Sequence, residues 1–167
     1  MRPAHAGYHG SCHCGRVRFE IDAVIDKVTR CNCSICAKKG ILHHSVPPER
    51  LRLVSGDEFL GTYQFGTMAA KHHFCTVCGT HTFTRPRAAP ELYTVNVRCL
   101  DDFDLAKEKP EIVEFDGRNW ERSVGQLGYG VLCEACAVAG RGRTPSPACS
   151  PSPKGGRKMA AVETISW

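Results

Sequence analysis

Short alternations of apolar and polar residues recur along the first three quarters of the chain. Val17, Phe19 and Ile21 are separated by arginine and glutamate, which predicts a strand with one buried face. Short runs between turn residues predict further strands at residues 51–53, 60–65, 80–84, 93–98 and 111–115, the fourth with its polar residues on one face. Only residues 34–39 suit a helical turn. The pattern therefore favours a mostly β fold of short strands and loops.

The composition changes towards the C-terminus. The net charge is +5, and residues 141–167 hold five basic residues and one acidic residue. This segment is rich in proline, serine and glycine and cannot bury enough apolar surface to offset its ordering entropy. We therefore expect one domain at residues 7–124 and a disordered basic tail at residues 125–167. A solvated tail is the common case, and an arm touching nucleic acid or an anionic surface is the alternative.

Several classes of protein are disfavoured by the composition. No stretch approaches the ~20 apolar residues that span a bilayer, and the N-terminus lacks the apolar region of a secretory signal. We therefore expect a cytoplasmic protein with no membrane partner. Before residue 141 the charges nearly cancel, which makes nucleic-acid binding unlikely in that part. The chain has 11 cysteines, an odd number, which in a reducing compartment indicates metal or thiol chemistry.

Most of the cysteines form three clusters, at residues 12–15, 31–36 and 75–79. A Cys-x-x-Cys-Gly turn brings two sulfurs to one ion, and glycine accepts the positive φ of the turn. Two such pairs complete the tetrahedron of a structural zinc site. The alternative is that some are buried free thiols. The clustered cysteines are Cys12, Cys14, Cys31, Cys33, Cys36, Cys75 and Cys78.

Seven sulfurs divide naturally into one four-sulfur site and one three-sulfur site. Spacing alone does not determine which pairs share an ion, although residues 31–36 are the best candidate for three ligands from one segment. A three-ligand zinc site keeps a position for water or substrate, which is typical of catalytic zinc. We expect Cys99 to be a buried thiol, and Cys133 and Cys136 have the spacing of a ligand pair but stay unassigned.

Three runs carry a family resemblance: residues 10–19, 30–40 and 71–79. Their order, together with the later runs 97–101 and 115–121, resembles the glutathione-dependent formaldehyde-activating enzyme family, also called the centromere-protein-V/GFA domain. The resemblance extends from residue 10 to about residue 124. It implies an Mss4-like zinc-binding fold.

The resemblance also implies ligands and an activity. Family members add the thiol of glutathione to formaldehyde, giving S-hydroxymethylglutathione, or run the reverse carbon–sulfur lyase step. Two zinc ions per chain are implied. The structural zinc would be held by Cys12, Cys14, Cys75 and Cys78. The catalytic zinc would be held by Cys31, Cys33 and Cys36.

Cations near the cysteine triple are candidate contacts for a small thiol such as glutathione. The candidates just after the triple are Lys38, Lys39, His43 and His44, which could also supply positive charge beside the sulfurs, and Arg98 lies in a predicted strand. Each could bind a carboxylate of glutathione, and each could equally be a solvated surface charge. His72 and His81 are expected to be hydrogen-bonded structural residues, with a proton shuttle as the alternative.

Two other functions remain open at this point. The first is a non-catalytic zinc scaffold that binds a protein or nucleic acid. The second is a carrier that binds glutathione without turning it over. The complete triple of Cys31, Cys33 and Cys36 favours a small-molecule site, because a scaffold has no need of an open metal position.

Overall fold

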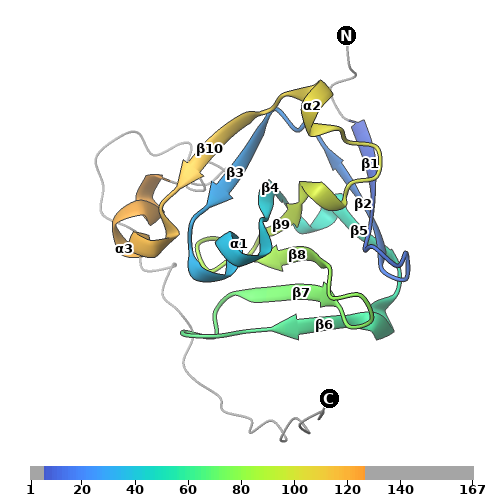
Figure 1. Ribbon diagram of the computed structural model, residues 1–167, viewed down its shortest axis with the longest axis horizontal. Helices are drawn as coiled ribbons and strands as arrows, with labels where there is room; N and C mark the ends of the chain where they lie inside the picture. Colours follow the sequence, from blue (N-terminus) through green and yellow to red (C-terminus); the bar gives the residue numbers. More distant parts are fainter. Residues whose placement is uncertain (1–5, 127–167) are drawn as a thin grey trace, which may run out of the picture. The chain divides into compact units, whose positions relative to one another are not determined.

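The computed structural model describes residues 6–126, and these residues form a mostly β fold with short helices, as expected (Figure 1). The α-helices are α1 (Ser34–Lys39), α2 (Leu105–Glu108) and α3 (Trp120–Ser123). The strands are β1 (Ala6–Ser11), β2 (Arg18–Ala23), β3 (Lys27–Cys31), β4 (Leu42–Val46), β5 (Leu51–Ser55), β6 (Leu60–Tyr63), β7 (Lys71–Cys75), β8 (His81–Arg85), β9 (Tyr93–Asn96) and β10 (Glu111–Phe115). The 3-10 helices are η1 (Pro48–Arg50), η2 (Asp57–Phe59), η3 (Val97–Cys99), η4 (Gly117–Asn119) and η5 (Val124–Gln126).

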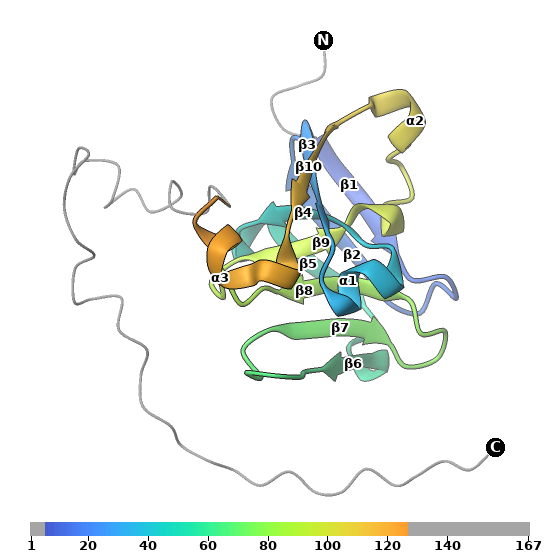
Figure 2. The ribbon, with the colours of Figure 1, turned by 60° about the vertical axis from the view of Figure 1, so that its left-hand side comes forward.

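The strands form two sheets. One has three strands in the order β1-β2-β5, and the other has seven in the order β10-β3-β4-β9-β8-β7-β6. Neighbouring strands are antiparallel except at one edge, where β10 runs parallel to β3 and Phe115 lies opposite Cys31. Figure 2 shows β10 beside β3, with α3 directly beyond the end of β10. The end of β10 therefore delivers residues 115–120 to the end of β3.

Four strands were not anticipated from the hydrophobic pattern: β1, β3, β4 and β7. Two of them carry adjacent histidines, His43 and His44 in β4 and His72 and His73 in β7, where an apolar residue would have marked the buried face. The prediction for residues 93–98 is wrong in one respect. Thr94 and Asn96 are buried like the apolar residues beside them, because β9 lies between β4 and β8, and η3 follows it.

The main core forms where the two sheets meet. Phe19 of β2 is 1% exposed, and its ring packs edge-on against Phe83 of β8 with 5.5 Å between centroids. Gly10 of β1 lies opposite Phe19 in the antiparallel register. A Cβ at residue 10 would stand 2.4 Å from the Phe19 ring, so only glycine lets β1 approach this closely.

Helix α1 confirms the predicted helical turn and carries the last cysteine of the triple. It begins after Cys33 and ends at Gly40, whose φ of 61° lies in the left-handed region. The amide of Gly40 donates to the carbonyl of Cys36, and Cys36 is the buried residue of the helix. Lys38 and Lys39 occupy the last turn, where the helix dipole favours positive charge.

Residues 127–167 lie outside the described residues. They include all but the first two residues of the expected tail, the unassigned Cys133 and Cys136, and one further cysteine, Cys149. The division of the chain at residue 124 stays a prediction. Among residues 6–126, no helix has both the length and the apolar character needed to cross a membrane.

We expect Phe19→Ala to lower the free energy of unfolding by about 3–5 kcal/mol, because it removes a buried ring and leaves a cavity. Urea denaturation followed by circular dichroism measures this change. Val24→Ala, at an exposed position directly after β2, is the control and should change stability by about 0.5 kcal/mol or less. Equal unfolding midpoints for the two variants would contradict the assignment of Phe19 to the core.

Candidate metal centres and substrate cavity

Four cysteines from two distant stretches of the chain meet in one cluster, which we call the four-sulfur cluster. Their sulfur atoms all lie within 4.8 Å of one another. The Cys12 and Cys14 sulfurs are 3.5 Å apart, and those of Cys14 and Cys75 are 3.7 Å apart. Zn–S bonds of about 2.3 Å place the sulfurs of a tetrahedral site about 3.8 Å apart. The donors therefore fit zinc. The members are Cys12, Cys14, Cys75 and Cys78.

Two similar turns form the four-sulfur cluster. Gly15 and Gly79 follow the second cysteine of each pair, and each has a φ of 73°. Their amides donate to the carbonyls of Cys12 and Cys75, at 2.9 and 2.8 Å. The amide of Val17 donates to Cys12 Sγ at 3.3 Å. The cluster thus connects the β1–β2 hairpin of one sheet to β7 of the other.

The second cluster, the cysteine triple, comes from a single segment. Cys31 ends β3, Cys33 precedes α1 and Cys36 lies within α1, and their sulfurs are within 4.8 Å of one another. Hydrogen bonds from Cys31 and then Cys36 lower the pKa of Cys33. These three sulfurs can hold a metal ion, and three donors leave one position of a tetrahedral ion for another ligand.

Gly117 is required for the shape of the cysteine triple. A Cβ at this position would lie 2.5 Å from Cys31 Sγ and 2.8 Å from Cys33 Cβ. The loop is held by Asn32, whose side chain donates to Asp116 at 2.9 Å and accepts from the amide of Arg118 at 3.1 Å. The contact between Gly117 and the cysteine triple was not anticipated from the sequence, where residues 115–121 only supported the family resemblance.

His43 of β4 contacts the cysteine triple from the buried side. Its Nε2 atom lies 3.2 Å from Cys36 Sγ. Burial lowers the pKa of His43 to about 4, so the ring is neutral at pH 7, and the expectation that His43 supplies positive charge beside the sulfurs is wrong. A thiolate can only accept, so with Cys36 ionised this hydrogen bond requires the proton on Nε2. Nδ1 is then an acceptor, and it has no hydrogen-bond partner among the described residues.

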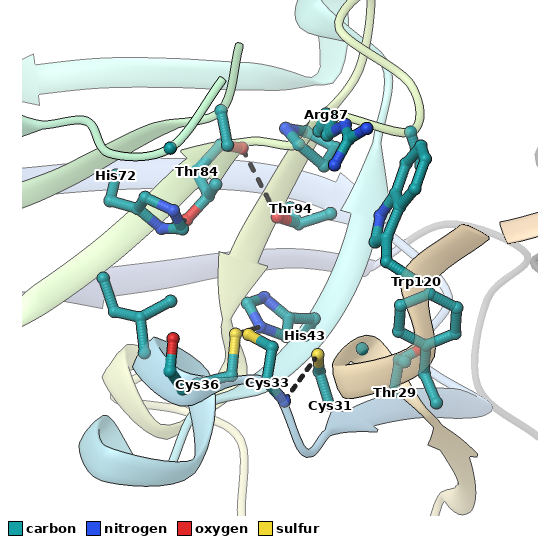
Figure 3. A pocket seen from close by; sticks show the side chains of 18 of the residues that line it. Thr29, Cys31, Cys33, Cys36, His43, His72, Thr84, Arg87, Thr94 and Trp120 are labelled. Atoms are coloured by element: carbon teal, nitrogen blue, oxygen red, sulfur yellow. Dashed lines mark hydrogen bonds between the residues drawn. The ribbon is translucent and has the colours of Figure 1, made fainter. Parts of the chain in front are cut away.

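A cavity of about 540 Å³ opens beside the cysteine triple (Figure 3). His43, His72 and Thr84 contribute to its lining, together with the three cysteines. Figure 3 shows Arg87 and Trp120 along the wall on the opposite side of this view from His72. The cysteine triple therefore faces a space large enough for a small molecule.

Hydrogen bonds link the cavity to the surface through two histidines. His81 Nε2 lies 2.8 Å from Thr84 Oγ1, which lies 3.5 Å from His72 Nδ1. Lys39 Nζ lies 3.5 Å from His81 Nδ1. Burial lowers the pKa of His81 to about 3 and also lowers the pKa of His72. Both rings are therefore neutral at pH 7.

Neither the two lysines nor the arginine proposed from the sequence lines the cavity. Lys39 packs over the Phe74 ring at 5.5 Å, and Arg98 Nε donates to the carbonyl of Gly40 at 3.0 Å. Lys38 is exposed on α1. Their assignment as substrate contacts stays a prediction. Cys99 is a buried thiol outside both clusters.

Two arginines that were not singled out from the sequence do line the cavity. Arg87 stacks on the Trp120 ring at 3.7 Å and lies 3.9 Å from Glu121. Arg118 is anchored through its Nε, which donates to the carbonyl of Asn32 at 3.1 Å. The sequence gives little indication of either arginine, because residues 85–90 and 116–120 are distant from the cysteine triple along the chain. Only the fold brings them near it.

The fold and the clusters define a small, mostly β protein with two cysteine sites able to bind metal, and comparison with known proteins identifies its family. Residues 7–116 match the family described as glutathione-dependent formaldehyde-activating enzyme, and the chain belongs to it. A Halomonas elongata protein provisionally named as such an enzyme is 30% identical over 133 residues, covering 68% of this chain and 83% of that protein. The crystal structure of a Rhodobacter sphaeroides protein is similar, with 37% identity and a TM-score of 0.59, over 63% of this chain and 98% of that one.

We expect the two clusters to respond differently to loss of one sulfur. Cys78→Ser should give insoluble or unfolded protein, because zinc binding by four thiolates is coupled to folding. Cys33→Ser should keep the fold and lose one of two zinc ions. Metal analysis of chelator-free protein and circular dichroism measure both effects. A soluble Cys78→Ser variant with unchanged thermal unfolding would contradict the structural role, and an unfolded Cys33→Ser variant would contradict the division into two sites.

We expect Gly117→Ala to lower the zinc content from two ions per chain towards one, because the added methyl group displaces Cys31 Sγ. Metal analysis measures the loss, and the thermal unfolding midpoint reports whether the fold is retained. Gly125→Ala is the control, since nothing lies within 4 Å of a Cβ there. Full zinc content in Gly117→Ala would show that the triple does not need this close contact.

Proposed function

We propose that this chain is a zinc-dependent carbon–sulfur lyase that joins glutathione to an aldehyde and catalyses the reverse cleavage. The observation that supports the proposal is the cysteine triple at the wall of a small-molecule cavity. A four-sulfur cluster leaves no position for substrate, so we assign it the structural zinc. The triple is assigned the catalytic zinc, held by Cys31, Cys33 and Cys36.

Zinc held by the triple would lower the pKa of a bound thiol and polarise a carbonyl oxygen. Three thiolates and one Zn²⁺ carry a net negative charge, which disfavours an incoming thiolate. Hydrogen bonds to the sulfurs reduce this cost. The amide of Cys33 donates to Cys31 Sγ at 3.4 Å, and His43 Nε2 is placed to donate to Cys36 Sγ.

The reaction needs one bond formed and one proton delivered. Glutathione loses its S–H proton to solvent, and the sulfur electron pair forms the bond to the aldehyde carbon. The carbonyl π pair moves to oxygen, which takes up a proton to give the hydroxyl of the product. His72 and Thr84 line the cavity and can donate hydrogen bonds to that oxygen as its charge develops. The lyase direction reverses each step.

Glutathione carries two carboxylates, and the cavity supplies two guanidinium groups. Arg87 and Arg118 line it from different loops, and arginine binds a carboxylate through paired hydrogen bonds. We assign these two residues the carboxylates of glutathione. The other candidates from the sequence lie outside the cavity lining and would act on the glutathione carboxylates only at longer range. They are Lys38, Lys39 and Arg98.

Two alternatives give different results in the same experiment. A glutathione carrier would bind the thiol without accelerating its reaction with aldehydes. A scaffold for a protein or nucleic acid would not bind it. A cytoplasmic location, where thiols stay reduced and glutathione is available, suits the enzyme and remains a prediction.

We expect glutathione to bind through its thiol, so S-methylglutathione should bind more weakly in calorimetric titration. Arg87→Gln and Arg118→Gln should each weaken glutathione binding by about 1–3 kcal/mol, the usual value of a charge-assisted contact. Lys38→Ala is the matched control and also tests the expectation from the sequence. Equal affinity for the thiol and its methyl ether would show that the metal does not bind the sulfur, and the scaffold alternative would then be favoured.

A further inference from the structure

The cavity has two chemically different parts. The first consists of the cysteine triple with the imidazole and hydroxyl groups beside it, which suits the reacting atoms. The second is apolar, and it includes Phe65, Pro86, Ala88, Phe115 and Trp120. Among the described residues, no aspartate or glutamate lines either part. The proposed function does not say what occupies the apolar part.

Formaldehyde has one carbon and no apolar substituent, so it cannot cover aromatic side chains. Glutathione is also a poor match for the apolar walls, because its surface is dominated by carboxylates, amides and an ammonium group. With glutathione and formaldehyde alone, the rings of Phe65 and Trp120 would stay in contact with water or with polar groups. Exposed apolar surface that lines a cavity usually marks the binding site of an apolar group.

Phe65 supports this argument because it is held at the cavity rather than buried in the core. Its side chain is 40% exposed, and it lies in the connection between β6 and β7. The ring stacks on His72 at 5.6 Å and on Tyr63 at 5.7 Å, with interplanar angles near 20° in both pairs, 21° and 22°. His72 lines the cavity, and Tyr63 does not. The stack therefore keeps an exposed apolar ring beside an imidazole of the cavity lining.

Trp120 occupies a similar position on another wall. It follows Gly117, which touches the cysteine triple, and its ring packs on the Arg87 guanidinium. Phe115 lies opposite Cys31 in the parallel register of β10 and β3. Aromatic surface therefore begins close to the sulfurs and extends to the arginine that we assigned to a carboxylate.

We infer that the aldehyde used by this site carries an apolar substituent, alkyl or aryl, which packs against Phe65 and Trp120 while the glutathione carboxylates pair with arginine. The inference rests on the proposed function and narrows it. The bonds formed and broken are those already given, with the substituent on the aldehyde carbon. The product is a hemithioacetal of glutathione with an apolar side group.

Initial rates with glutathione and three aldehydes, formaldehyde, hexanal and benzaldehyde, test the inference in the zinc-loaded full chain. Each rate is divided by the uncatalysed rate under the same conditions, because the aldehydes differ in reactivity. We expect this acceleration to be at least about tenfold larger for hexanal or benzaldehyde than for formaldehyde, since pocket contacts with a few methylene groups give such ratios. A larger acceleration for formaldehyde would overturn the inference and leave the proposed function standing. No acceleration with any aldehyde would overturn both.

Substitutions in the cavity lining test whether its aromatic residues cause the preference for the apolar aldehyde. Phe65→Ala and Trp120→Ala should each lower the ratio of hexanal to formaldehyde acceleration by about tenfold. Val54→Ala is the control, an exposed apolar side chain outside the cavity lining, and it should leave the ratio unchanged. An unchanged ratio in both Phe65→Ala and Trp120→Ala would overturn the inference.

Binding gives a readout that does not depend on turnover. S-hexylglutathione should bind more tightly than S-methylglutathione, by about tenfold or more, because only the longer chain reaches the aromatic walls. Phe65→Ala should reduce this difference, and Val54→Ala should not. Equal affinity for the two thioethers would contradict an apolar subsite, whatever the fate of the enzymatic proposal.

Discussion

The meeting of four thiols from two sheets is the constraint on which the rest of the architecture depends. Cys12 and Cys14 follow the first strand of the small sheet, while Cys75 ends β7 of the large one. The apolar cluster around them is small, with Val17 as its buried aliphatic residue. Because β7 also carries His72, the geometry of this cluster sets the position of a side chain in the cavity. A donor set that holds the sheets together therefore also aligns the cavity.

Both clusters consist of cysteine sulfurs, but the surroundings of these sulfurs differ. Cys12 and Cys75 are fully buried, and amide hydrogen bonds and turn glycines fix them. Cys31 and Cys33 are partly exposed and face the cavity, and their neighbours are a neutral histidine and a glycine that leaves room. The two clusters therefore differ in the number of sulfur donors, in burial and in access from the cavity. These are the properties that distinguish structural metal sites from metal sites with a position for another ligand.

Sequence reasoning could identify the seven cysteines, the mostly β class and the helical turn, because these depend on spacing and local alternation. It could not identify β4 or β7, whose apolar pattern is interrupted by histidines, of which His43 and His72 line the cavity. Arg87 and Arg118 were missed for another reason. Each lies far along the chain from the cysteine triple, and only the pairing of β10 with β3 and the order of strands around β9 bring them to one space.

The parallel pairing of β10 with β3 has a consequence for how the protein is made. β3 and α1 carry the cysteine triple early in the chain, whereas Phe115, Gly117 and Trp120 follow at the end of β10. Synthesis proceeds from the N-terminus, so the three thiols leave the ribosome well before the segment that walls them in. A nascent chain that stops before β10 contains all the sulfurs of both clusters. It lacks Phe115, Gly117 and Trp120, and with them one wall of the cavity that could enclose a ligand.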